Sequence, residues 1–165
     1  MFIDISYLNY IILFIMMIFI SELLAYCWHK FGAHEDIIPE MFKVQESHLK
    51  HHTIVDDSAY DDFMYILIFL IVYTFLLIYL IKIQMITYLL ASCIYFPVLM
   101  ASFWNFYIHS AYHSENHWLN EYEWFRNDKR IHFQHHRNPT TNYGISTHFS
   151  DVIFDTFDYG LLKDI

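Results

Sequence analysis

Glycine, proline and cysteine are scarce in this chain of 165 residues, which holds three glycines, three prolines and two cysteines. So few turn-forming residues exclude a collagen-like chain and disfavour a turn-rich β sandwich. Cys27 and Cys93 both lie in apolar stretches, so they form neither a secreted disulfide framework nor a thiolate metal site. Positive charge is also limited, because nine basic residues against eighteen acidic ones give a formal net charge of −9. We therefore expect no nucleic-acid partner.

Hydrophobic residues, in contrast, make up 56% of the chain and concentrate in three long runs. Roughly 20 apolar residues are needed to cross a bilayer, so we expect membrane-spanning helices at about residues 5–28, 63–81 and 85–108. The first run contains one acidic residue, Glu22, and the other two contain no charge. No lysine or arginine precedes the first run, which disfavours a cleaved signal peptide.

Basic residues are distributed unevenly between the segments that join these runs. All except Lys82 fall in residues 29–62 and 109–165, so the positive-inside rule places these two blocks in the cytosol. Four aromatic residues near the ends of the first and third runs are expected at the membrane interface: Tyr26, Trp28, Trp104 and Tyr107. The prediction is an all-α fold, a single membrane domain over residues 1–165, with about three spanning helices and a cytosolic helical cap.

Histidine is unusually abundant, with twelve residues, and ten of them form four clusters. The clusters are His29 and His34; His48, His51 and His52; His109 and His113; and His132, His135 and His136. Positions i, i+3 and i+4 share a helix face, so we expect each triplet to present three imidazoles to one point. The first pair has a spacing of five, and we expect the helix to fray at Gly32 so that the second imidazole turns inward.

All four clusters lie just outside the apolar runs, so they can converge on one face of the membrane. Ten protonated imidazoles would repel one another, whereas neutral imidazoles bound to metal would not. Ten ligands exceed the needs of one ion, which predicts two ions with about five nitrogens each. Imidazole suits zinc, copper, iron and nickel. Two irons would fit a redox role, but the spacing of the histidines does not distinguish iron from zinc or another of these metals.

Other polar residues near the clusters each have two candidate roles. Glu22 lies seven residues before His29, and Asn105 lies one turn before His109, so each either orients that histidine or is solvated at the interface. His117 and His148 are expected at the surface or in support of the ligands. Four basic residues of the last block are either a docking site for an acidic electron donor or ordinary solubilising charges: Arg126, Lys129, Arg130 and Arg137.

The four clusters, in this order and around membrane helices, resemble the histidine boxes of the fatty acid hydroxylase/sterol desaturase superfamily. The tail adds to the likeness, because Asn142-Tyr143-Gly144 is similar to the family's Asn-aromatic-Gly. Residues 150–156 are similar to its Trp-Asp-x-x-Phe-Gly-Thr ending, with Ser150 in place of the tryptophan and Asp155 in place of the glycine. The resemblance covers residues 20–158, nearly the whole chain.

The resemblance implies a di-iron centre held by the ten clustered histidines, with O2 as co-substrate and no catalytic residue beyond the metal ligands. Electrons would come from an external donor of the cytochrome b5, reductase or ferredoxin type. The reaction implied is hydroxylation or desaturation of an apolar membrane lipid such as a fatty acyl chain or a sterol. The location implied is the endoplasmic reticulum of a eukaryote or the plasma membrane of a bacterium.

Two alternatives accompany this interpretation. The H-x4-H box followed closely by H-x2-H-H is also similar to β-carotene-type hydroxylases, although the H-x3-H spacing of His109 and His113 favours the fatty acid and sterol enzymes. A non-catalytic membrane metal-binding or metal-transport protein is the alternative of another class. Transporters place their ligands near the bilayer midplane, whereas these histidines lie outside the apolar runs.

Overall fold

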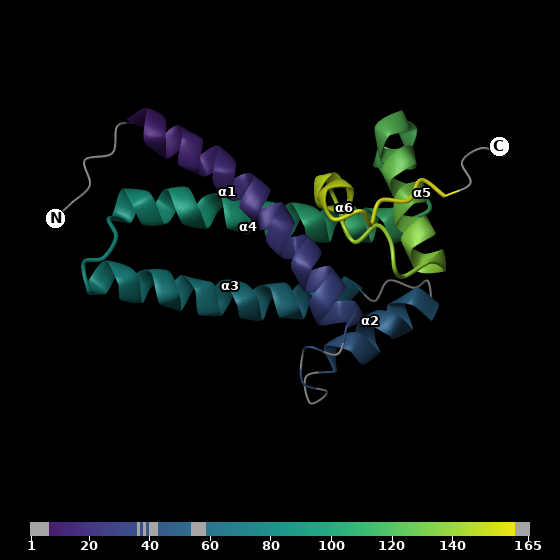
Figure 1. The fold of residues 1–165 in the computed structure, drawn as a ribbon, viewed down its shortest axis with the longest axis horizontal. Helices are drawn as coiled ribbons and strands as arrows, with labels where there is room; N and C mark the ends of the chain where they lie inside the picture. The colour runs from purple at the N-terminus through teal and green to yellow at the C-terminus, as the bar shows by residue number, and fades with distance from the viewer. Residues whose placement is uncertain (1–6, 36, 38, 40–42, 54–58, 161–165) are drawn as a thin grey trace.

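The structure, a computed structural model, describes residues 7–35, 37, 39, 43–53 and 59–160, with the side chains of 59–63 and 65 left aside. Three long helices form its body (Figure 1). They are α1 (Tyr7–Cys27), which continues into a π-helix, η1 (Trp28–His34); α3 (Ala59–Lys82); and α4 (Tyr88–His113). The described residues contain no strand, as the prediction of an all-α fold requires.

Helices α3 and α4 run antiparallel and are joined by a short turn, and α1 crosses α4 obliquely (Figure 1). The turn needs one residue in the left-handed region, and Gln84 supplies it with a φ of 59°. Thr87 then begins α4, because its hydroxyl accepts a hydrogen bond from the Leu90 N–H at 3.2 Å. Tight turn chemistry between two uncharged runs therefore produces the helical hairpin.

The long helices expose apolar side chains over most of their outer surface. Ile11, Phe75 and Met100, one from each helix, are 58%, 67% and 64% exposed. An apolar exterior of this extent suits lipid rather than water. The α1–η1 segment and α4 are both long and apolar enough to cross a membrane, whereas the described apolar part of α3, Ile66–Lys82, is shorter.

Among the described residues, four short helices form a cap where η1 and α4 end (Figure 1). They are α2 (Val44–Thr53), the 3-10 helix η3 (Trp118–Glu121), α5 (Glu123–Arg137) and α6 (Phe149–Ile153). A small apolar core joins the end of α4 to η3 and α5; its members are Ile108, Ala111, Tyr112, Leu119 and Phe125. This core fixes the position of α5 relative to α4, and so the position of the histidines on both helices.

Three of the four aromatic residues expected at the membrane interface are exposed, and the fourth is not. Trp28, Trp104 and Tyr107 expose 45%, 48% and 38% of their surface, whereas Tyr26 exposes only 2%. Tyr26 does not expose its ring at such an interface, because the C-terminal segment covers it: the ring stacks on Phe154, with centroids 5.2 Å apart. Composition cannot reveal such a contact between residues 128 positions apart.

Candidate metal centre

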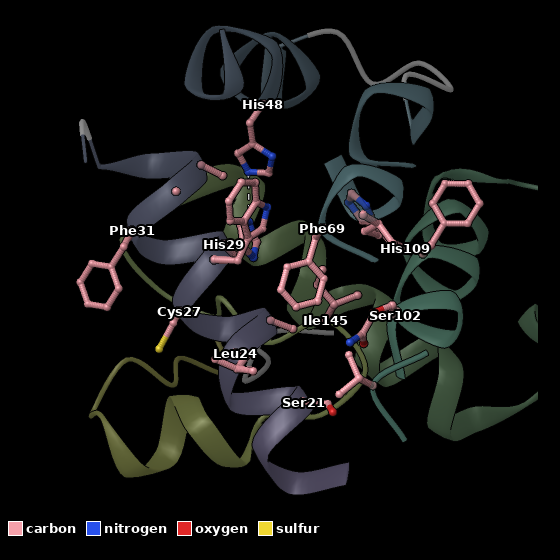
Figure 2. Close-up of a pocket in the computed structure, with 18 of the residues that line it drawn as sticks. Ser21, Leu24, Cys27, His29, Phe31, His48, Phe69, Ser102, His109 and Ile145 are labelled. Atoms are coloured by element: carbon pink, nitrogen blue, oxygen red, sulfur yellow. Dashed lines mark hydrogen bonds between the residues drawn. The ribbon is translucent and has the colours of Figure 1, made fainter. Parts of the chain in front are cut away.

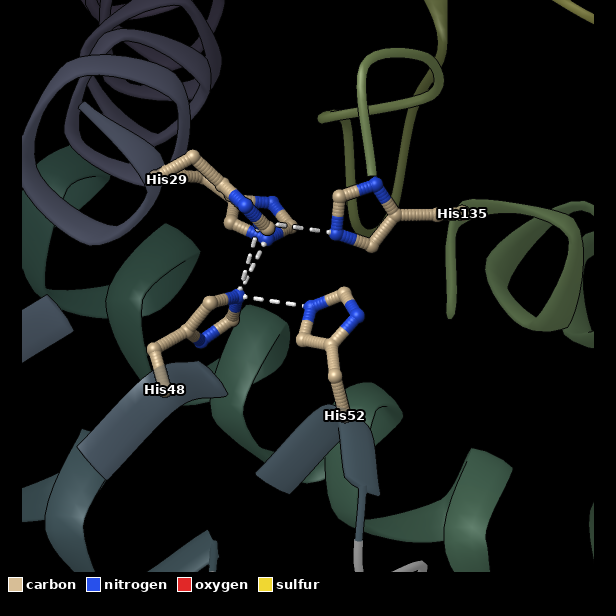
Figure 3. Close-up of side chains that lie close together, drawn as sticks. His29, His48, His52 and His135 are labelled. Carbon is tan, nitrogen blue, oxygen red and sulfur yellow. Dashed lines mark hydrogen bonds between the residues drawn. The ribbon is translucent and has the colours of Figure 1, made fainter. Parts of the chain in front are cut away.

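All ten clustered histidines come together at the cap end of the long helices, in two groups of five. The first histidine group consists of His29, His34, His48, His52 and His135. The second histidine group consists of His51, His109, His113, His132 and His136. Within each group the ligand nitrogens all lie within 4.8 Å of one another, so each group can hold one metal ion. Figure 3 shows four members of the first group directed toward a common centre from η1, α2 and α5.

The sequence predicts that each histidine triplet serves one point, but the structure divides each triplet between the two groups. On α2, His48 and His52 belong to the first group and His51 to the second; on α5, His135 belongs to the first group while its neighbours at 132 and 136 belong to the second. An α-helix turns about 100° per residue, so positions i and i+4 lie about 40° apart and i+3 lies about 60° to the other side. A helix placed between two sites therefore gives two ligands to one and one to the other.

The first pair is brought together by a π-helix and not by fraying at Gly32. The chain from Trp28 to His34 forms the wider i to i+5 turns, and the N–H of Glu35 bonds the carbonyl of Lys30 at 3.1 Å. Five residues are slightly more than one turn of such a helix, so His29 and His34 share a face, and their ring centroids lie 5.1 Å apart. The spacing of five is thus suited to a π-helix.

Two imidazoles of the first group are held by backbone carbonyls of the tail loop, residues 141–147. Nδ1 of His29 donates to the carbonyl of Tyr143 and Nδ1 of His135 donates to the carbonyl of Thr141, each at 2.6 Å. A neutral imidazole carries one N–H, so this contact leaves Nε2 of both rings as a lone-pair donor directed into the group. Carbonyl support of this kind fixes the tautomer that metal binding requires.

The nitrogens of the first group are arranged to coordinate a cation rather than to hydrogen-bond one another. Nε2 of His48 lies 3.0 Å from the Nε2 atoms of His29, His34 and His52. A single imidazole nitrogen carries either one proton or one lone pair, so it cannot hydrogen-bond three neighbours at once. One ion among them accepts a lone pair from each ring, and the donor set therefore fits a metal.

The surroundings keep these imidazoles neutral, the form that binds metal. Burial lowers the pKa of His48 well below its ordinary value, and the charges of neighbouring histidines add to the effect. The same causes, in the same order, lower the pKa of His132 in the second group. Ligands that are already deprotonated at neutral pH release no proton on binding a metal, which favours its uptake.

An apolar cavity of about 460 Å³ opens between α1, α3 and α4 and reaches both histidine groups. His29 and His48 of the first group and His109 of the second line it, and Ser21 lies at its opposite end (Figure 2). Val98 also lines the cavity, and it precedes His109 by eleven positions, which is about 16 Å along a helix. The cavity thus runs from the histidines into the membrane-spanning part of the bundle.

Glu22 and Asn105 bond to each other, whereas the sequence left open for each either the support of a histidine or solvation at the interface. The amide of Asn105 donates to one oxygen of the Glu22 carboxyl group at 3.1 Å. The hydroxyls of Ser146 and Thr147 donate to the other oxygen at 3.0 and 3.1 Å, and Ser146 also contacts Asn105. Glu22 therefore joins α1 and α4 to the tail loop, whose carbonyls in turn hold two histidines of the first group.

His117 and His148 lie outside both groups. Nδ1 of His117 accepts from the Leu119 N–H at 3.3 Å, so this residue caps η3. His148 is not a surface residue, because only 14% of its side chain is exposed and it lies 3.7 Å from both Asp128 and Asp151.

Asp151 is fully buried and has a structural role that the sequence did not predict. Its two oxygens accept the N–H groups of Tyr143 and Gly144, each at 2.8 Å, and thereby hold the tail loop that supports His29. Its place in the tail motif is the only signal of this role in the sequence. Asp155, where the family has glycine, has a φ of 55°, a conformation that glycine adopts without strain.

Comparison with known proteins agrees with this geometry. The profile of the fatty acid hydroxylase family matches residues 14–156, which include all ten clustered histidines, Glu22 and Asp151. No curated protein and no solved structure matched the chain. With most of its length matched, and with both histidine groups assembled at the end of an apolar helical bundle, the chain belongs to the fatty acid hydroxylase family.

Proposed function

We propose that this protein is an O2-dependent membrane hydroxylase that uses two irons to oxidise an apolar lipid. The observation that carries the proposal is the cavity that joins both histidine groups to the membrane-spanning helices. A metal-storage or transport protein has no need of an apolar cavity beside its ligands. Family membership supports an oxidoreductase of the hydroxylase or desaturase type.

The ten histidines of the two groups are the proposed iron ligands. Ten imidazole nitrogens without any thiolate suit iron, and five per site exceed the four ligands of a closed structural zinc site. When bound, the irons supply the chemistry that converts a C–H bond, O2, two electrons and two protons into an alcohol and water. The protein provides ligands of fixed tautomer and a cavity wall that keeps water away.

The cavity also indicates how a substrate lies. Its lining is mostly apolar, with Phe69 and Val98 on the side of the membrane-spanning helices, so an alkyl chain or a sterol skeleton can pass from the bilayer to the histidines without exposing apolar surface to water. The carbon nearest His29 and His109 is the one placed for oxidation. A volume of about 460 Å³ is within the range of pockets that enclose a small molecule.

Electrons come, in this proposal, from a separate acidic donor that docks on α5 on the cytosolic side. Arg126 and Arg130 on α5 and Arg137 at its end are exposed, and so are available to such a partner. Lys129 is not, because its ammonium group donates to the carbonyl of Ser114 at 2.8 Å. We therefore expect reversal of charge at Arg126 and Arg130 together to slow electron transfer without changing the metal content.

The test is to purify the protein in detergent, measure iron per chain, and search for products labelled from 18O2 in membranes supplied with a reductant. We expect about two irons per chain and an 18O-labelled alcohol. An unlabelled alkene would assign desaturation instead. His135→Ala should abolish product, whereas His117→Ala, outside both groups, should retain it. Equal activity of the two variants, or transport of metal without O2, would contradict the proposal.

A further inference from the structure

Helix α6 has its polar and apolar faces reversed relative to a helix that lies in water. Ser150 and Asp151 are 2% and 0% exposed, whereas Val152 and Ile153 are 64% and 66% exposed. Burying a carboxylate and exposing two branched apolar side chains is unfavourable at a water-facing surface. The outer face of α6 therefore suits an apolar environment.

Helix α5, in the same cap, has the ordinary arrangement. Phe125 and Ile131 are 0% and 6% exposed, and Arg126 and Arg130 project outward. The contrast shows that the cap has two kinds of surface, one charged on α5 and one apolar on α6.

The position of α6 indicates which apolar environment it meets. The ring of Phe149 packs edge-on against Phe19 of α1, with centroids 5.8 Å apart, and Phe154 stacks on Tyr26. The stretch from Tyr7 to Tyr26 provides the roughly 20 residues that cross the hydrocarbon. Helix α6 thus lies beside the membrane-spanning part of α1, close to where α1 crosses α4 (Figure 1).

We propose that α6 is an interfacial membrane segment, with Val152 and Ile153 inserted at the boundary between lipid headgroups and acyl chains. Its apolar face continues the exposed apolar surface of α1, on which Phe19 is 57% exposed. Asp155, two residues after the end of α6, is exposed, so it limits the depth to the headgroup level. The lipid bilayer, rather than a protein partner, is the occupant that this continuity favours.

This proposal revises the expectation that residues 109–165 lie wholly in the aqueous phase, and it does not depend on the reaction that the protein performs. It also gives the membrane a part in arranging the metal centre. Asp151 on the inner face of α6 holds the tail loop, and the tail loop holds His29.

The test is site-specific quenching of the whole protein in lipid vesicles. Single cysteines at Val152 or Ile153 are labelled with a nitrobenzoxadiazole fluorophore in a background without Cys27 and Cys93. The matched control carries the label at Arg130, on the exposed face of α5. Each label is quenched separately by nitroxide-bearing lipids and by aqueous iodide, and unchanged elution and helicity establish that each variant is folded.

We expect a several-fold higher ratio of lipid to iodide quenching at positions 152 and 153 than at position 130. Iodide quenching at both α6 positions equal to that at position 130 would overturn the proposal, because α6 would then face water. Protection from both quenchers would also overturn it, since a protein partner or a second copy of the chain would then cover α6. Two independent α6 positions keep the test decisive if one labelled variant fails to fold.

Discussion

Replacing His148 by glutamine is expected to remove a pH-dependent part of the free energy of unfolding. The imidazole lies between two carboxylates, with Nε2 3.7 Å from Asp128 and Nδ1 3.7 Å from Asp151. Burial lowers the pKa of His148, but the two carboxylates outweigh burial and raise it to about 9. At neutral pH the residue is therefore a buried cation paired on both sides.

The magnitude follows from the difference between folded and unfolded chains. The unfolded pKa is about 6.5, so the folded protein holds the proton more tightly, and at 1.36 kcal/mol per pH unit the gain is about 3 kcal/mol. A raised pKa stabilises the fold fully below about pH 6.5 and loses its effect as the pH rises through about 9. At pH 7.5 about 2 kcal/mol is still present.

The assay is denaturant unfolding of the detergent-solubilised protein, followed by far-ultraviolet circular dichroism from pH 6.5 to 9.5. The wild type should exceed His148→Gln by about 3 kcal/mol at pH 6.5, and the difference should shrink to a few tenths at pH 9. His117→Gln is the matched control, because that side chain caps η3 and packs against aromatic rings such as Tyr107, without an ion pair among the described residues. A difference that stays constant over this range would show that His148 is neutral and would refute the reasoning.

Three further predictions concern the metal centre and the network beside it. His34→Ala and His113→Ala each remove a ligand of one histidine group. Elemental analysis should therefore show about one metal ion lost from each single variant and two from the double variant. Loss of both metal ions from a single variant would show that the two groups do not bind metal independently. Glu22→Gln should keep the free energy of unfolding, whereas Glu22→Ala should lower it by about 1–3 kcal/mol, because the alanine leaves buried polar partners on α4 and the tail loop without hydrogen bonds. Equal thermal unfolding of the two variants would contradict this prediction. The chelated protein should lose stability as the pH falls below about 6.5, because burial lowers the pKa of His48 and His132 and the unfolded chain then takes up protons that the folded chain excludes; an unfolding temperature of the chelated protein that stays constant between about pH 7.5 and 5.5 would contradict this.

Composition and spacing predict much of this molecule because they report on local properties. A long uncharged apolar run specifies a helix suited to lipid wherever it occurs, and such runs predict α1 and α4. Histidine in four clusters next to these runs predicts a metal centre for the same reason, since each cluster is already arranged by its own helix. Even the total of about five nitrogens per ion agrees with the two groups that the structure assembles.

The assignment of each histidine to a group depends on tertiary structure. His51 and His135 join the group opposite to their neighbours because α2 and α5 lie between the two sites, and no periodicity reports where a helix lies. The partners of Glu22, the burial of Tyr26 and the support of His29 by a carbonyl 114 residues away are contacts between distant segments. Only packing in three dimensions brings such segments together, so the order of residues predicts which groups bind metal and the fold decides how they are shared.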